Sequence, residues 1–230
     1  TSLEGLAVST DPETPWHQIM PDAPLMQIVA DGKDLEDITK SLLRGDNDYI
    51  ILEEMRDAAA FKLAVDVTSI GTVRSKATIH AGDAHDIPYK MASAISAKYG
   101  GDLKPLIARI FRSFNYVIEL YQVPSDRSRK RLKGISEYRY DPISATVSIH
   151  TICRYDETSK RWRWKYDIGE DKKNMGKLQP DEFKKMEEME SKLGAVVEKV
   201  NGTGVQYEVD LPSDPPFTKE VMDVPLPPKK

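Results

Sequence analysis

The sequence predicts an α/β protein in which a mainly parallel sheet with crossover helices precedes an antiparallel β meander and a C-terminal helix. From residue 25 to about residue 123, short apolar segments typical of strands alternate with helical stretches, which is the pattern of crossover connections in a parallel sheet. After residue 114, strand-like segments follow one another with only turn-rich segments between them, as in a series of hairpins.

The composition fits a folded chain that is not built mainly to hold polyanions. The 230 residues are 40% hydrophobic with a mean hydropathy of −0.50, which leaves enough apolar material for a core. A net charge of −4 argues against a chain made chiefly to hold nucleic acid or an anionic membrane. Cys153 is the single cysteine and indicates a reducing compartment. Because no apolar run approaches the about 18 residues of a membrane span, we expect a cytoplasmic protein.

Proline is concentrated at both ends of the chain. Ten of the 15 prolines lie outside residues 25–211, so we expect the compact body between them and an extended tail after it. The sequence predicts three segments: an α/β core at 1–123, an antiparallel appendage with a charged helix at 124–210, and a proline-rich tail at 211–230.

Capping residues place the elements of the α/β core. Asp34 is predicted to cap a helix that stops at Gly45, and Asp57 to cap an Ala-rich helix that stops at Gly71. The segment 49–52 is continuously apolar, as in strands buried on both faces of a parallel sheet. The other expected elements of this part are strands at 26–29 and 74–79 and helices at 87–99 and 103–114.

The appendage is predicted from alternating and aromatic-rich segments. We expect antiparallel strands at 116–120, 134–140, 146–155 and 162–166. A charged helix is expected from about 180 to 200, with Pro180 near its start and Asn201-Gly202 at its end. The basic run 126–133 lies between two strand-like segments, and we interpret it as a solvated hairpin tip.

Two adjacent carboxylates end the apolar strand that begins at Tyr49. Glu53 and Glu54 are costly at the end of a buried strand unless they have a partner or a function. The carboxyl edge of a parallel sheet is where α/β proteins bind ligands. One such carboxylate can hold Mg²⁺ and its neighbour can orient a water for attack on a phosphate. The alternative is an ordinary strand end with surface acids.

A histidine ends the next predicted strand. His80 follows the acid pair by about one strand–helix–strand unit, so the two strand ends are expected to be neighbours. Glu54 and His80 would then lie in one cleft. His85 lies close to His80 in sequence, with acids between them, but a zinc site there would need a further ligand.

These residues resemble the ring-forming ATPases of type II and type IV secretion and pilus assembly. In that family an apolar strand ends in Gly-Glu followed by a small or apolar residue, Arg, and Asp or Gly, and a later strand ends in Thr-(Ile/Leu)-His. This chain has Glu54-Met55-Arg56-Asp57 and Thr78-Ile79-His80-Ala81 at that spacing. The resemblance covers about residues 8–170 and implies a RecA-like P-loop NTPase core.

The resemblance implies a role for each matching residue. Glu54 would be the catalytic carboxylate that polarises the attacking water, and His80 would contact or sense the γ-phosphate. Thr10-Asp11-Pro12-Glu13 is similar to the acidic box that helps to place Mg²⁺. The resemblance thus implies ATP and Mg²⁺ as cofactors, with Glu53 and Glu54 as metal-binding residues and Asp11, Glu13, Arg44 and Arg56 as further binding residues.

Departures from the family pattern qualify these roles. Glu53 replaces a glycine and Thr10 replaces a glutamate of the family. No Gly-x-x-x-x-Gly-Lys-(Ser/Thr) occurs in the chain, so the loop that cradles phosphates is absent. We therefore expect the C-terminal portion of a longer ATPase, unable to hydrolyse ATP by itself.

The resemblance implies two kinds of partner. One is further copies of the chain, assembled into a hexameric ring, and the other is a secretion, conjugation or pilus machine. The location implied is cytoplasmic, or peripheral at the inner face of the cell membrane, without specific nucleic-acid binding. Two other readings stay open. One is a non-catalytic interaction or regulatory module with an ATPase-like fold. The other is a nucleic-acid-binding β module that uses residues 127–133 and the tryptophans Trp162 and Trp164.

Overall fold

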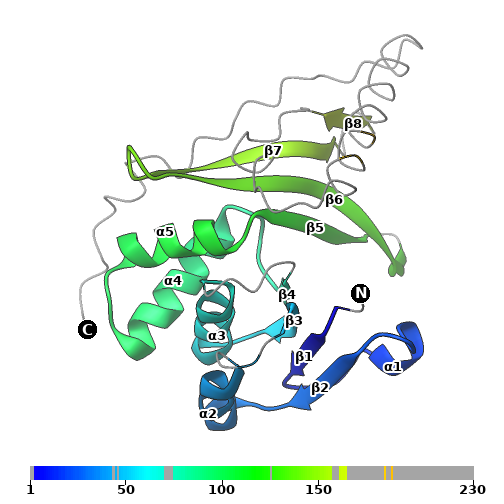
Figure 1. Cartoon of the computed structure of the whole chain (residues 1–230). Helices are drawn as coiled ribbons and strands as arrows, with labels where there is room; N and C mark the ends of the chain where they lie inside the picture. Colours follow the sequence, from blue (N-terminus) through cyan, green and yellow to red (C-terminus); the bar gives the residue numbers. More distant parts are fainter. Residues whose placement is uncertain are drawn as a thin grey trace. The chain divides into compact units, whose positions relative to one another are not determined.

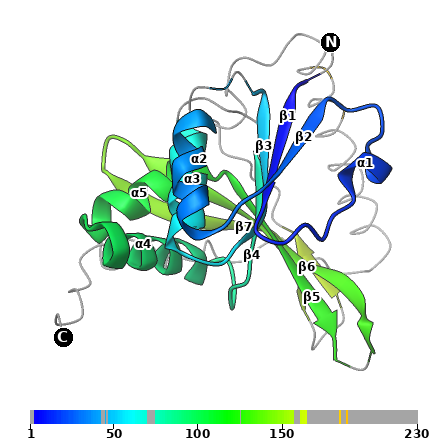
Figure 2. The same cartoon turned by 90° about the horizontal axis from the view of Figure 1, so that it is seen from below.

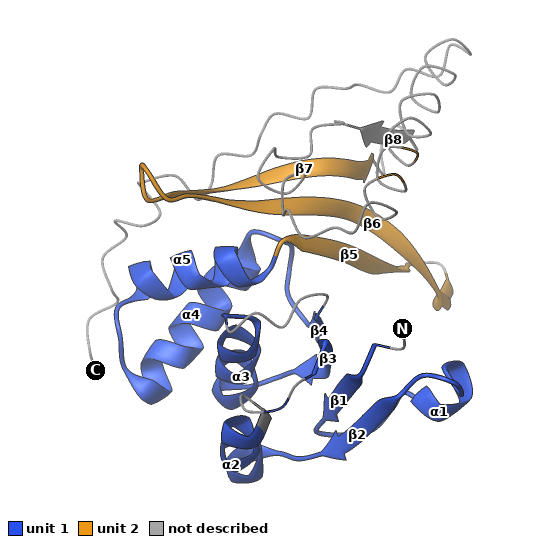
Figure 3. Cartoon of the chain, viewed as in Figure 1, with its two compact units in different colours: residues 1–114, 225–230 blue, residues 115–224 orange. Residues whose placement is uncertain are grey.

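A computed structural model describes residues 3–42, 45, 47–69, 75–124, 126–156, 161–164, 184 and 188. Their elements fall into two compact units that divide between Phe114 and Asn115 (Figure 3). The sequence placed this boundary after residue 123. It lies earlier in the structure because strand β5 (Tyr116–Val123) forms an antiparallel ladder with strand β6 (Asp126–Asp141).

The first unit contains a four-stranded parallel sheet with the order β2-β1-β3-β4 (Figure 1). All five residues of β1 are buried, because this strand pairs with β2 on one side and with β3 on the other. Gly5 of β1 lies opposite Tyr49, whose ring fills the space that a Cβ at Gly5 would need. The strands are β1 (Gly5–Ser9), β2 (Leu25–Val29), β3 (Tyr49–Met55) and β4 (Lys76–Ile79).

Strand β1 corrects one expectation. The proline distribution put the compact body between residues 25 and 211, yet an inner strand of the sheet, β1, and helix α1 (Trp16–Ile19) precede residue 25. The prolines of this region lie in the connection from β1 to β2 and around α1. They therefore lie between two strands of the sheet and not before the folded part of the chain.

The longer helices of this unit are α2 (Gly32–Leu42), α3 (Ala58–Ser69), α4 (Asp86–Tyr99) and α5 (Leu103–Ser113). Figures 1 and 2 show α2 and α3 on the same side of the sheet. Seven of the 12 residues of α3 are buried, among them Phe61, Leu63 and Val65, so this helix supplies much of the core. Asp57 caps α3 as predicted, since its Oδ1 accepts a hydrogen bond of 2.9 Å from the amide of Ala60.

Helix α2 begins earlier than its predicted cap. It starts at Gly32, and the amide of Leu35 donates to the carbonyl of Asp31. The prediction of Asp34 as N-cap was therefore wrong. This residue lies in the first turn, where the positive end of the helix dipole favours an acidic side chain.

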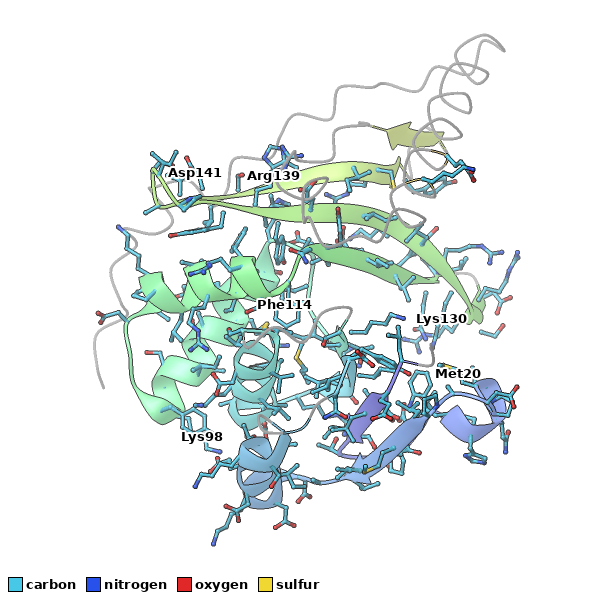
Figure 4. The ribbon with its side chains drawn as sticks, in the orientation of Figure 1. Met20, Lys98, Phe114, Lys130, Arg139 and Asp141 are labelled. Carbon is cyan, nitrogen blue, oxygen red and sulfur yellow. The ribbon has the colours of Figure 1, made fainter. Side chains whose placement is uncertain are left out.

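Surface side chains connect the helices of the first unit. Lys98 of α4, labelled in Figure 4, donates a hydrogen bond of 2.6 Å to Oε1 of Glu36 in α2, and the hydroxyl of Tyr99 donates to the same oxygen. Arg109 of α5 lies 2.9 Å from Asp66 of α3. These contacts fasten α4 to α2 and α5 to α3.

The second unit is an antiparallel meander with the strand order β5-β6-β7-β8, as the sequence predicted (Figure 1). It includes β7 (Thr146–Asp156) and β8 (Arg161–Trp164). Its buried side chains include Tyr138, Val147, Ile149 and Cys153. The predicted helix at 180–200 and the tail at 211–230 lie outside the described residues, apart from single positions at 184 and 188.

The α/β class, with a parallel sheet followed by an antiparallel one, is confirmed. Within the described ranges, the structure has no helix long and apolar enough to cross a membrane.

Candidate functional site

A recess of about 140 Å³ lies at the carboxyl edge of the parallel sheet. Three strands end there, because β1, β3 and β4 run in the same direction. This edge is where α/β sheets place their ligands. The recess is lined by Asp11, Glu13, Thr14, Glu53, Glu54, Thr78, Ile79 and His80.

The adjacent acids at the end of β3 lie at a break in the strand register. Leu52 pairs with Ala77 and Met55 pairs with Ile79, so two residues of β3 stand opposite the single residue Thr78 of β4. In a regular strand, Glu53 and Glu54 would point to opposite faces. An extra residue in one strand bends the backbone and re-aims side chains, and both acids here line the same recess.

Glu54 and His80 lie next to each other, as the sequence predicted. Oε1 of Glu54 is 3.4 Å from Nε2 of His80. The Glu54 side chain is 20% exposed, whereas that of His80 is 93% exposed. The imidazole therefore stands at the mouth of the recess, with the carboxylate deeper inside.

Arg56 holds the other oxygen of the same carboxylate. Its guanidinium forms an ion pair with Oε2 of Glu54. This hydrogen bond is the main cause that holds the pKa of Glu54 below 4.5, with a smaller contribution from the charge of His80 and an opposing effect of burial. Glu54 is consequently ionised at neutral pH.

Asp11 and Glu13 line the recess from the loop after β1. The carboxylate of Glu54 is the main cause that raises the pKa of Arg56, and the charges of Glu13 and Asp11 add to it. Strand β1, which the sequence analysis missed, is the element that carries this acidic loop to the carboxyl edge.

Glu53 has partners of its own. Its Oε1 accepts hydrogen bonds from the indole of Trp16 and, at 3.2 Å, from the side chain of Gln27. Its Oε2 is buried and forms no hydrogen bond within the described part of the chain. Glu53 thus ties α1 and β2 to the end of β3, and only Oε2 is left for the metal role that the sequence suggested.

Two contacts fix the end of β4. The hydroxyl of Thr78 donates to the main-chain carbonyl of Glu53, and Nζ of Lys90 in α4 donates to the carbonyl of His80. Just beyond, the amide of His85 donates to Oδ1 of Asp83 over 2.7 Å. Main-chain contacts therefore hold His80 in place although its ring is exposed.

The recess has the donor chemistry that Mg²⁺ prefers, since carboxylate oxygens surround it. No group of three or more His, Cys, Asp or Glu side chains in the described ranges is arranged to hold a metal, so the alternative of a metal at His80 and His85 gains no support. Mg²⁺ is commonly bound through one or two carboxylates, with waters and phosphates as its other ligands. Glu54 together with Asp11 or Glu13 would supply the two carboxylates of such a Mg²⁺ site.

Sequence reasoning missed Trp16, because nothing local marks a tryptophan as the partner of a distant glutamate. Arg44, another candidate, lies outside the described residues.

A second cavity, of about 10 Å³, shares Glu54 with the recess and is also lined by Ser9 and Thr10. The hydroxyls of Ser9 and Thr10 are buried and form no hydrogen bond with any described residue. Such unsatisfied groups lower the stability of a core.

Comparisons with known proteins agree with the resemblance of the motifs. The sequence profile of the family described as "Type II/IV secretion system protein" matches residues 23–154, more than half of the chain. That match runs from β2 into β7 and includes the ends of β3 and β4 at the recess. No curated protein matches the chain.

Three solved structures are similar to the chain. The VirB11 ATPase of the Brucella suis type IV secretion system, in complex with sulphate, is 17% identical with a TM-score of 0.49, over 62% of this chain and 41% of that one. The Legionella pneumophila ATPase DotB is 15% identical with a TM-score of 0.45, over 69% and 38%. The pilus retraction motor PilT with bound ADP is 17% identical with a TM-score of 0.40, over 59% and 38%. The matched regions span about two fifths of the length of those proteins.

Proposed function

Because the chain belongs to the type II/IV secretion system protein family, we propose that it is the C-terminal portion of an ATPase that powers protein secretion, conjugation or pilus assembly. The proposed enzyme is a ring of identical subunits, a hexamer by resemblance to the family. It works in the cytoplasm, or at the inner face of the cell membrane, beside the machine that it drives.

One observation supports this proposal most strongly. Glu54 and His80 come from the ends of two neighbouring parallel strands and lie 3.4 Å apart at the edge of a recess. A carboxylate that orients water, next to a group that meets the phosphate, is the arrangement that phosphoryl transfer to water requires.

In the proposed enzyme the two residues have different tasks. With its pKa held below 4.5, Glu54 is a weak base, so it orients the attacking water through a hydrogen bond and stabilises its developing positive charge. His80, exposed at the mouth of the recess, meets the phosphoryl oxygens. Arg56 fixes the orientation of Glu54 through their ion pair.

Mg²⁺, when bound, would neutralise part of the negative charge on the phosphate oxygens. Glu54 would hold it together with one acid of the loop after β1, Asp11 or Glu13, and Oε2 of Glu53 is the alternative second donor.

The size of the recess limits what it can contain. Sites that enclose whole small molecules usually have about 300–1,000 Å³, whereas this recess has about 140 Å³. It therefore suits the reacting phosphate end of a nucleotide. Because the 230 residues contain no Gly-x-x-x-x-Gly-Lys-(Ser/Thr), the loop that cradles the phosphates is proposed to come from a preceding part of the same protein.

The absent motif also favours the second candidate, a non-catalytic interaction or regulatory module that keeps an ATPase-like fold. The two candidates differ in what the whole protein does. In an enzyme, the coding sequence before Thr1 contains a Gly-rich loop ending in Gly-Lys-Ser or Gly-Lys-Thr, and the whole protein hydrolyses ATP.

The test measures phosphate release from MgATP by the whole protein and by the 230-residue chain, each with and without Glu54→Gln. We expect turnover by the whole protein that falls by about 10²-fold or more in the variant, and only background turnover by the chain. Whole-protein turnover unchanged by Glu54→Gln would refute the role of Glu54. Turnover by the chain alone that Glu54→Gln abolishes would refute the need for a separate phosphate loop.

A further inference from the structure

The hairpin of β5 and β6 is a cationic region on an acidic chain. Between Tyr116 and Lys133 the chain has five Lys or Arg residues and two acids, a net charge of +3, whereas the whole chain has −4. The basic residues lie in the first half of β6 beside the turn at Pro124, and Figure 4 labels Lys130 there. The five are Arg127, Arg129, Lys130, Arg131 and Lys133.

Most of these cations have no carboxylate near them in the part of the chain that the structure describes. Arg127, Arg129, Lys130 and Arg131 are exposed. Among the described residues, Lys133 alone of the five lies within 4.0 Å of a carboxylate, that of Glu119. Four positive charges are therefore available to an acidic partner.

The same hairpin exposes aliphatic side chains at the edge of its sheet. Strand β5 is the first strand of the order β5-β6-β7-β8, so its outer edge has no neighbouring strand among the described residues. Ile118 is 65% exposed and Leu120 is 66% exposed. They alternate with Glu119 and so share a face of the strand, next to Ile135 and Leu132 of β6, with which they pair.

Such an edge is unusual in a protein that stays alone. Edge strands are normally protected by charged side chains, proline or shortness, because their unpaired amide and carbonyl groups are a template for another strand. Strand β5 is eight residues long and has one charged residue, Glu119, whose side chain is mostly buried. In the part of the chain that the structure describes, no strand pairs with the outer edge of β5, and the side chains of Ile118 and Leu120 are exposed there.

The chemistry discriminates between possible occupants. A lipid bilayer cannot satisfy the amide and carbonyl groups of an open edge, so insertion of Ile118 and Leu120 would leave that edge unpaired. Of the side chains on this face of β5, Tyr116 alone is aromatic, 44% exposed, whereas proteins that bind single strands stack successive bases on several aromatic rings. A second copy of the chain would bring two hairpins of charge +3 together.

An extended acidic segment of a partner protein could satisfy the strand edge, the aliphatic face and the cations together. Its backbone continues the ladder of β5, its apolar side chains cover the aliphatic face, and its carboxylates reach the cations of β6. We propose that the outer edge of β5 is a docking site for an acidic segment with alternating apolar residues, which binds by adding a strand to the sheet.

The test uses the 230-residue chain and a fluorescein-labelled nine-residue peptide of alternating aspartate and valine, with binding followed by fluorescence anisotropy. Three further peptides separate the contributions. One has lysine in place of aspartate, one has serine in place of valine, and one has N-methyl groups on alternate backbone amides. We expect only the first peptide to bind well, because the others lose charge complementarity, apolar contact and strand pairing, respectively.

Variants of the chain locate the site. Ile118→Thr with Leu120→Thr keeps residues that favour strands, and should weaken binding roughly tenfold. Arg129→Glu with Lys130→Glu should weaken it at least as much, and more strongly at low salt. The matched controls are Ile143→Thr, an isoleucine that is 95% exposed in the turn between β6 and β7, and Lys33→Glu at an exposed position of α2. Both should bind like the parent chain.

Several results would overturn the proposal. Equal binding of the N-methylated peptide would show that no strand is added, and equal losses in the control variants would place the site elsewhere. Binding of oligo-dT or of phosphatidylserine vesicles, but not of the acidic peptide, would replace the partner by a nucleic acid or a membrane. Dimers that dissociate on Ile118→Thr with Leu120→Thr would assign the edge to a second copy. Protection from hydrogen exchange, in the chain alone, of the β5 amides that point away from β6 would show that the edge is already paired.

Discussion

Oε1 of Glu54 lies 3.4 Å from Nε2 of His80, which joins the carboxyl ends of β3 and β4 at one recess. The other oxygen of Glu54 is held by Arg56. One oxygen of the Glu54 carboxylate thus faces the imidazole of His80 and the other the guanidinium of Arg56. The ionisation of Glu54 can be tested without any ligand.

Arg56→Gln should raise the pKa of Glu54 toward 4.5, because the variant loses the hydrogen bond that does most to lower it. Carboxyl ¹³C chemical shifts followed through an NMR pH titration would measure the change. The pKa of Glu36, lowered mainly by Lys98, is an internal control and should not move.

The same shift gives a pH dependence of stability. The pKa of Glu54 is lower in the folded chain, so the stability that it contributes is present above pH 4.5 and is lost as the pH falls through the lowered value. In Arg56→Gln, the free energy of unfolding should depend less on pH below 4.5. Urea titrations at several pH values below 4.5 would measure the free energy of unfolding of the parent chain and of Arg56→Gln. The same pH dependence in both would contradict an effect of the Arg56–Glu54 pair.

Trp16→Phe should loosen the acidic loop after β1. The substitution removes the indole hydrogen bond to Glu53, and a bond to a charged, partly exposed group contributes about 1 kcal/mol. A double-mutant cycle with Glu53→Ala, which leaves no acceptor for the indole, measured by urea unfolding, should give a coupling energy of about that size. Additive effects of the two changes would contradict the contact, and Gln27→Ala serves as a comparison at the second donor.

Asp57→Ala should lower the free energy of unfolding by about 1 kcal/mol, since it removes the cap of α3. Asp57→Asn is the matched control, because asparagine also caps helices well and should restore most of the loss. Thermal and urea unfolding would measure both variants. An equal loss in both would assign the effect to charge and not to the cap.

Cys153 should resist alkylation in the folded chain. Burial raises the pKa of its thiol to about 11, so at pH 7.5 its thiolate fraction is roughly a hundredfold lower than that of a thiol with the reference value of 9.0. Since the chain has no other cysteine, the rate of iodoacetamide labelling reports the opening of β7. Labelling at the same rate in native buffer and in urea would contradict this burial.

The sequence predicted an element correctly where the signal for it lies within the element itself. The apolar run from Tyr49 and the cap at Asp57 predicted β3 and the start of α3, and the acid pair and the strand-ending histidine predicted where two strand ends meet. Strand β1 was missed because its five residues are buried only through partners on both sides that come later in the chain.

Two features of the site have no local signal. The irregular register at Glu53 and Glu54 arises from how β3 meets β4, so neither strand alone predicts it. The bond from Trp16 to Glu53 depends on the path of the chain between β1 and β2. The basic run fell where it was expected, next to a hairpin turn, but its cations occupy the strand and not the turn itself.

The central place of β1 has a consequence for anyone who trims this protein. Strand β2 pairs with β1 and with no other described strand. Deleting the first nine residues would therefore leave β2 without a pairing partner and separate it from the rest of the sheet. A shortened protein that begins after β1 would thereby lose the strand that positions the acidic loop with Asp11 and Glu13.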